Sequence, residues 1–152
     1  MSYVVLLLVH LLAAAFWVGG MATMHFAVRP AVIATLEPPL RLRTMAAALR
    51  RFFVGVDAAV TLLFASGFAM VMRAGGFRGL HWRIEAMMGI ALVMAGVYVY
   101  IRAAVFPALR RAIEQSAWPA AGARLHTVRM LVSLNLLLGM AVFAVAIVGR
   151  AG

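Results

Sequence analysis

The N-terminal apolar stretch carries no formal charge, yet it contains two histidines and two methionines that could bind a soft metal ion. Counted in helical steps, His10, Trp17 and Met21 fall on one stripe, and this stripe continues to Met24 or His25. An imidazole inside a bilayer needs a polar partner or a ligand, so we expect the stripe to face protein or a cofactor. Thioether and imidazole groups are ligands that Cu(I) accepts. The stripe therefore predicts a site for copper or another cofactor, with packing or a hydrogen bond to a neighbouring helix as the alternative.

A second set of polar residues lies toward the opposite end of the predicted spans. Asp57 interrupts an apolar stretch about a turn and a half after Arg51. It either forms an ion pair with Arg51 or Arg129, relays protons, or orients His25 or His126 as a ligand. Counting residues from the span ends places all five side chains in the cytoplasmic half of the membrane, whereas His10 falls in the outer half.

Composition fixes the class of protein that must position these side chains. The chain has 152 residues, 66% of them hydrophobic, and its mean hydropathy is +1.05. Such a composition is typical of an integral membrane protein. We predict one domain over residues 1–152, an all-α bundle of four membrane-spanning helices at about 3–27, 52–73, 84–106 and 127–149. The first span is too long for a signal peptide and is expected to stay in the mature chain.

Prolines and polar residues mark the expected connections between these spans. The first helix is predicted to pass through Pro30 and to end near Leu36, before the Glu37–Pro39 interruption. A polar connection is predicted between Arg110 and Arg124. Small residues should let the first and third spans approach closely, namely Gly19, Gly20, Gly89 and Gly96.

The charge of the chain is strongly positive, with 14 basic residues, all arginine, against four acidic ones. The arginines cluster at the ends of the apolar stretches, a pattern that indicates contact with lipid headgroups and excludes nucleic acid as the partner. Ten of them lie in the first and third connections and four elsewhere. The positive-inside rule then places both termini on the outer side of the membrane and the first and third connections in the cytoplasm.

An internal repeat divides the chain into two helical hairpins. Pro30 and Pro107 are 77 residues apart, as are Glu37 and Glu114. One residue later in register, Arg51 corresponds to Arg129 and Asp57 corresponds to Asn135. The repeat predicts two parallel-duplicated hairpins related by an axis along the membrane normal.

Several motifs resemble those of the CopD family of bacterial inner-membrane proteins implicated in copper handling. The first is H-x6-W-x-G-G, at His10, Trp17, Gly19 and Gly20, followed by Arg29-Pro30-Ala31. The others are Arg51-Phe52 with Ser66-Gly67, Phe106-Pro107-Ala108-Leu109, and Arg129-Met-Leu-Val-x-x-Asn135 running to Gly149-Arg150. The resemblance covers essentially the whole chain and implies a copper-handling membrane protein.

His10, Trp17 and Gly20 are also similar to the first-helix H-x6-W-x-x-G of the HemJ family, protoporphyrinogen oxidases thought to bind b-type haem. That family's basic residue and histidine on the third helix have no clear match here, where Glu85 and Tyr100 stand instead. This departure weighs against the oxidase activity and leaves His10 as an axial haem ligand to be tested.

Three functions therefore stay open at the level of sequence. They are copper handling, a haem-bearing redox protein that could be an oxidoreductase, and an accessory subunit without a cofactor. Cysteine is absent, so no thiolate is available as a ligand or nucleophile. The expected partners are the lipid bilayer and a periplasmic copper carrier or redox protein, and a homodimer is left open. Copper would be held by His10, His25, His126, Met21 and Met24, and haem b by His10, Trp17, His25 and His126 with Arg51 and Arg129 at its propionates.

Overall fold

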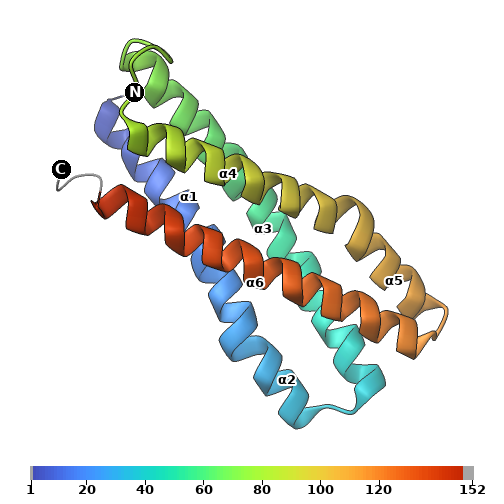
Figure 1. The fold of residues 1–152 in the computed structure, drawn as a ribbon. Coiled ribbons are helices and arrows are strands. Elements are labelled where there is room, and N and C mark those ends of the chain that lie inside the picture. Colours follow the sequence, from blue (N-terminus) through green and yellow to red (C-terminus); the bar gives the residue numbers. More distant parts are fainter. Residues whose placement is uncertain (1, 149–152) are drawn as a thin grey trace.

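The computed structural model describes residues 2–148, which form four long helices arranged as an elongated bundle (Figure 1). The first and third helices each contain a π-helical turn that divides them into two α-helical parts. In chain order the elements are α1 (Tyr3–Thr23), η1 (Met24–Val28), α2 (Arg29–Thr35), α3 (Pro38–Arg73), α4 (Trp82–Tyr100), η2 (Ile101–Val105), α5 (Phe106–Glu114) and α6 (Trp118–Val148).

The connections at one end of the bundle are shorter than the sequence suggests. Leu36 and Glu37 are extended and separate α2 from α3, as the prolines predict. The polar connection predicted between Arg110 and Arg124 is mostly helical, and only residues 115–117 are non-helical there. Ser116 turns the chain with a positive φ of 55°. Pro119 then lies in the first turn of α6, where a helix tolerates a missing backbone N–H.

The two π-helical turns occupy equivalent positions in the internal repeat. η1 and η2 start 77 residues apart, the same separation as Pro30 and Pro107. In each turn the backbone N–H of the residue before the proline reaches back five residues, from Arg29 to Met24 and from Phe106 to Ile101. The extra residue relieves the clash between a proline ring and the preceding turn. The predicted duplication of two hairpins is thereby confirmed.

The core lies where the two hairpins meet, and aromatic rings fill its centre. α1 packs along α3, α4 packs along α6, and α1 also contacts α6. Trp17 and Tyr98 meet edge to face with ring centroids 6.1 Å apart, and Phe53 lies 5.8 Å from Tyr98 and 5.2 Å from Phe106. Such T-shaped pairs add to the stabilisation from apolar burial. Trp17 therefore joins residues of both hairpins in one cluster.

Glycines bring α1 close to α3 and α6, not to α4 as expected from the sequence. A Cβ at Gly20 would collide with the ring of Phe52 on α3. At Gly139 on α6 a Cβ would lie 2.7 Å from a methyl group of Val18 on α1. By contrast, a Cβ at Gly19, Gly89 or Gly96 would meet nothing within 4 Å. Close packing therefore requires a glycine at Gly20 and Gly139, and also at Gly55 on α3, where a Cβ would lie 2.5 Å from the ring of Phe16 on α1.

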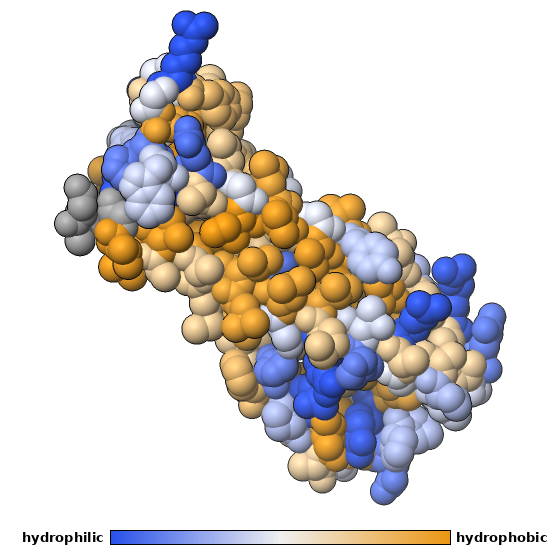
Figure 2. Space-filling view, in the orientation of Figure 1, coloured by the Kyte–Doolittle hydropathy of each residue, from blue (hydrophilic) through white to orange (hydrophobic). Residues whose placement is uncertain are grey.

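The outside of the bundle suits a membrane. Figure 2 shows apolar surface over the middle of the molecule and hydrophilic residues gathered at its two ends. Each of the four helices is long and apolar enough to cross a bilayer. Exposed leucine, valine and phenylalanine side chains along α1, α3, α4 and α6 would be unfavourable in water but are favourable in lipid. The protein is a multi-pass membrane protein.

Candidate functional site

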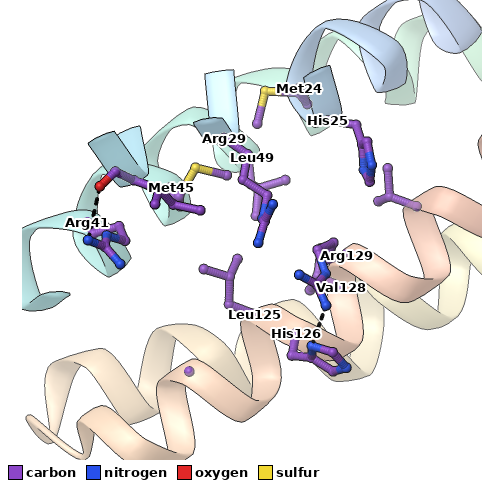
Figure 3. A pocket seen from close by; sticks show the side chains of 13 residues that line it. Met24, His25, Arg29, Arg41, Met45, Leu49, Leu125, His126, Val128 and Arg129 are labelled. Carbon is purple, nitrogen blue, oxygen red and sulfur yellow. Dashed lines mark hydrogen bonds between the residues drawn. The ribbon is translucent and has the colours of Figure 1, made fainter. Parts of the chain in front are cut away.

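A cavity of about 280 Å³ lies near the end of the bundle that carries α2 and α5. It opens between η1 and α2 on one side, α3 on a second and α6 on a third (Figure 3). Its walls combine apolar side chains such as Leu49, Leu125 and Val132 with side chains that could bind a ligand. We refer to it as the Met/His cavity.

Four side chains with soft or imidazole donor atoms line the Met/His cavity. Met24 and His25 belong to η1, Met45 to α3 and His126 to α6. Figure 3 shows Met24 and Met45 on the wall formed by the first hairpin and His126 on α6 opposite. Met24 and His25 are adjacent in η1, and both line the cavity.

The His25 imidazole is oriented by α6. Its Nδ1 lies 3.3 Å from the hydroxyl oxygen of Ser133, a group that can donate or accept a hydrogen bond. When Nδ1 carries the proton and donates it to Ser133, the lone pair of Nε2 is available to a metal ion. Its ring also meets Phe26 edge to face, with centroids 4.8 Å apart. These contacts fix the position of the ring at the cavity wall.

His126 differs from His25 because one of its ring nitrogens accepts a hydrogen bond from Arg129. The Nη2 of Arg129 lies 2.8 Å from Nδ1 of His126. A guanidinium only donates, so Nδ1 must accept and the proton of the neutral ring sits on Nε2. Neither nitrogen then offers a free lone pair. His126 can become a ligand only if Arg129 moves away from it.

Three arginines line the same cavity and make it electropositive. Arg41 donates to the carbonyl oxygens of Ile33 and Leu36 at 3.0–3.3 Å and so caps the C-terminal end of α2. Arg29 points into the cavity in Figure 3 and makes no hydrogen bond or ion pair with the described residues. Together with Arg129 they surround the donor atoms, and no acidic side chain is among the lining residues.

His10 lies apart from this cavity, between α1 and α3. Its Nδ1 is 3.1 Å from the carbonyl oxygen of Leu63 and 3.1 Å from the hydroxyl oxygen of Ser66. The carbonyl can only accept, so Nδ1 donates, and the hydroxyl of Ser66 donates in turn to Leu62 at 2.6 Å. Nε2 of His10 therefore keeps its lone pair, the arrangement found in most metal-binding histidines.

The remaining predicted ligands on α1 are core residues. The side chains of Trp17 and Met21 are each 2% exposed and pack in the cluster between the hairpins. Neither lines the Met/His cavity. The structure thus separates the predicted stripe into His10 against α3, Trp17 and Met21 in the core, and Met24 with His25 at the cavity.

Asp57 pairs with residues that the sequence did not indicate. Its carboxylate accepts a hydrogen bond of 2.5 Å from the hydroxyl of Tyr98 and lies 3.4 Å from the guanidinium of Arg102. The expected ion pair with Arg51 or Arg129 is wrong. On a helix a separation of six residues turns a side chain by about 240°, so Arg51 faces away from Asp57. Both actual partners lie on the second hairpin, so Asp57 joins the two halves of the chain.

Few groups of side chains in the described residues could bind a metal ion together. Within residues 2–148, no three His, Cys, Asp or Glu side chains lie close enough to hold a metal ion. A site with three or more protein ligands in this part of the chain would therefore need methionine sulfur, backbone oxygen or another donor beside these residue types. Sequence reasoning missed Met45, Arg29 and Arg41, because an isolated methionine in a span is typical of packing and interfacial arginines are typical of headgroup contact.

Fold and cavities define a multi-pass membrane protein of two duplicated hairpins with a cavity between them at one end. The sequence model of the family described as copper resistance protein D, CopD, matches residues 46–148. The chain belongs to this family. It matches no curated protein and no solved structure.

Proposed function

We propose that this protein binds Cu(I) in the Met/His cavity and passes it on, as a copper-handling protein of the bacterial inner membrane. The observation that carries the proposal is the convergence of Met24, His25 and Met45 from two helices on one cavity in a member of a copper resistance family. Two thioethers and one imidazole form a three-coordinate donor set that suits Cu(I), which is soft. Hard divalent ions prefer oxygen donors and would be excluded.

The charge of the cavity supports a transient site. The three donors are neutral, so bound Cu(I) keeps its positive charge next to Arg29, Arg41 and Arg129. The positive charges of these arginines repel a bound cation and weaken its binding. A protein that hands copper on needs such a site, because an ion held too tightly is not released. His126, once released by Arg129, adds a fourth donor from the opposite wall, on α6.

The test is a titration of the purified, detergent-solubilised protein with Cu(I) in competition with a chromogenic chelator, without oxygen. Replacing both Met24 and Met45 by leucine keeps the volume of the side chains and removes the sulfurs. We expect this change, or His25→Ala, to weaken Cu(I) binding about tenfold or more, a loss of ~1.4 kcal/mol or more. X-ray absorption at the copper edge should lose its sulfur scattering in the double variant.

Met21→Leu is the matched control. Met21 lies on the same helix less than a turn before Met24, but it is buried in the core and does not line the cavity. Its replacement should leave Cu(I) affinity within about twofold of the wild type. Unchanged Cu(I) affinity in the Met24/Met45 double variant and in His25→Ala would remove the cavity as the copper site. A loss of Cu(I) affinity in Met21→Leu alone would place the copper site at the stripe of His10, Trp17 and Met21 instead.

The geometry of His10 favours a second candidate function, b-type haem binding in the outer half of the membrane. The Leu63 carbonyl fixes the tautomer of His10 and leaves Nε2 as the ligand atom. An absorption spectrum of the purified protein decides this point. A Soret band that shifts on reduction with dithionite and disappears in His10→Ala supports haem. A colourless protein with stoichiometric copper supports the copper proposal, and a protein that takes up neither supports an accessory role.

A further inference from the structure

A second cavity, of about 470 Å³, lies at the same end of the bundle as the Met/His cavity, between α3 and the η2–α5 segment. Four of its lining residues are arginines and two are apolar, and none is acidic. We call it the arginine groove. It is lined by Arg50, Arg51, Val54, Arg102, Phe106 and Arg110.

The arginine groove is the repeat equivalent of the Met/His cavity. Each residue that lines the groove corresponds, at the offset of 77 or 78 residues, to a residue that lines the Met/His cavity. Both spaces lie between the first helix of one hairpin, just after its π-helical turn, and the second helix of the other hairpin. The corresponding pairs are His25 with Arg102, Arg29 with Phe106, Ile33 with Arg110, Val128 with Arg50, Arg129 with Arg51, and Val132 with Val54.

The two copies differ in chemistry although they agree in position. His25 of the first cavity is replaced by Arg102 in the groove. Two apolar positions of the first cavity likewise carry Arg110 and Arg50 in the groove. Imidazole can bind a metal ion, whereas a guanidinium only donates hydrogen bonds and favours phosphate and carboxylate. The lining of the groove therefore favours an anionic ligand.

Two of the four positive charges are compensated within the protein. Arg102 pairs with Asp57 at 3.4 Å, and Arg110 pairs with Glu114 at 3.5 Å. Arg50 and Arg51 form no ion pair with the described residues. The groove therefore keeps a surplus of two positive charges. A ligand with two phosphate charges would neutralise it.

The position of the groove identifies the ligand as a lipid. Arg50 and Arg51 stand where the apolar part of α3 begins, at the depth of lipid headgroups. One turn further into the membrane, Val54 is 63% exposed and forms the apolar floor of the groove together with Phe106. A soluble anion has nothing to place against Val54, whereas a phospholipid has an acyl chain. We propose that the arginine groove binds an anionic phospholipid, with preference for a headgroup that carries two phosphates.

Native mass spectrometry of the full-length protein with added lipid tests this proposal. The probes are cardiolipin, phosphatidylglycerol and phosphatidylethanolamine, with inorganic pyrophosphate as the soluble source of the same charge. We expect cardiolipin to bind about tenfold more tightly than phosphatidylglycerol, and phosphatidylethanolamine to bind without saturation. Replacing Arg50 and Arg51 together by glutamine should weaken cardiolipin binding about tenfold. Pyrophosphate should not displace the lipid.

The matched control removes two charges at the opposite end of the bundle, one at the end of α3 and one in the turn that follows it. Arg73 and Arg78 are exposed, and their joint replacement by glutamine should change cardiolipin affinity less than about twofold. Arg110→Gln, on the other wall of the groove, provides a second variant in case the first pair fails to fold. Equal losses in the groove and control variants, unchanged affinity in both groove variants, or displacement of the lipid by pyrophosphate would each overturn the assignment. None of these results bears on copper binding.

Discussion

Replacement of Asp57 by asparagine tests how the two hairpins are held together. The Asp57 carboxylate on α3 accepts from Tyr98 on α4 and pairs with Arg102 in η2, so both contacts cross between the hairpins. The asparagine side chain has nearly the same volume and still accepts a hydrogen bond from Tyr98, but the charge is lost. The change therefore isolates the contribution of the negative charge.

The size of the effect follows from the two contacts. A hydrogen bond to a charged group contributes ~1.5–3 kcal/mol and a neutral one ~0.5–1.5 kcal/mol, so the Tyr98 contact should lose about 1–1.5 kcal/mol. The Arg102 pair is about half exposed, with side chains 43% and 47% accessible, and should contribute no more than ~1 kcal/mol. We expect Asp57→Asn to lower the free energy of unfolding by about 1–2.5 kcal/mol. This corresponds to a fall in Tm of about 3–8 °C for a chain of this length.

The assay is thermal unfolding in detergent, followed by tryptophan fluorescence, in a double-mutant cycle with Tyr98→Phe. We expect a coupling energy of about 1 kcal/mol or more between the two positions. Additive effects of Asp57→Asn and Tyr98→Phe would show that the contact does not stabilise the protein. The same variants also test the proposed proton relay, because a relay predicts that copper-dependent growth falls even when the folded yield is normal.

Two further predictions concern packing and orientation. Gly139→Ala should destabilise the bundle by ~1–3 kcal/mol, because its Cβ would lie 2.7 Å from Val18, whereas Gly96→Ala, which meets nothing within 4 Å, should be neutral or slightly stabilising in the same unfolding assay. Equal effects at the two positions would contradict the close approach of α1 and α6. We propose that both termini face the periplasm, so alkaline phosphatase fused after Gly152 should be active. Fluorescence from a reporter that folds only in the cytoplasm, fused at the same position, would show that the topology is the opposite one.

The helices and the duplication could be predicted from the sequence because both depend on long-range regularities. Apolar length sets each span, and the Pro30 and Pro107 spacing marks the repeat. The π-helical turns were not predicted, because the pattern that both share, Ala-Val-x-Pro-Ala at 27–31 and 104–108, does not by itself specify a π-helical turn. The first of these turns contributes Met24 and His25 to the Met/His cavity. The sequence therefore names Met24 and His25 as donors but cannot show that they face it together.

The partners of polar side chains were the least predictable feature. Counting depth brings Asp57 near Arg51, but the helical phase turns the two side chains apart, and the actual partner Tyr98 looks like part of an interfacial aromatic belt. Asn135, at the corresponding place of the second hairpin, donates instead to the carbonyl of Met94 at 3.0 Å, within its own hairpin. Equivalent positions thus share a depth but not a partner. Depth follows from sequence, whereas rotation about the helix axis depends on packing.

The matching π-helical turns also explain how one fold can hold two cavities of different chemistry. Because η1 and η2 occupy the same register, each hairpin bends at the same place and leaves a corresponding space beside the other hairpin. In a symmetric dimer of one hairpin, the two spaces would be identical by symmetry. In a single chain that carries both hairpins they can differ, so one is lined by Met24 and His25 and the other by Arg50, Arg102 and Arg110.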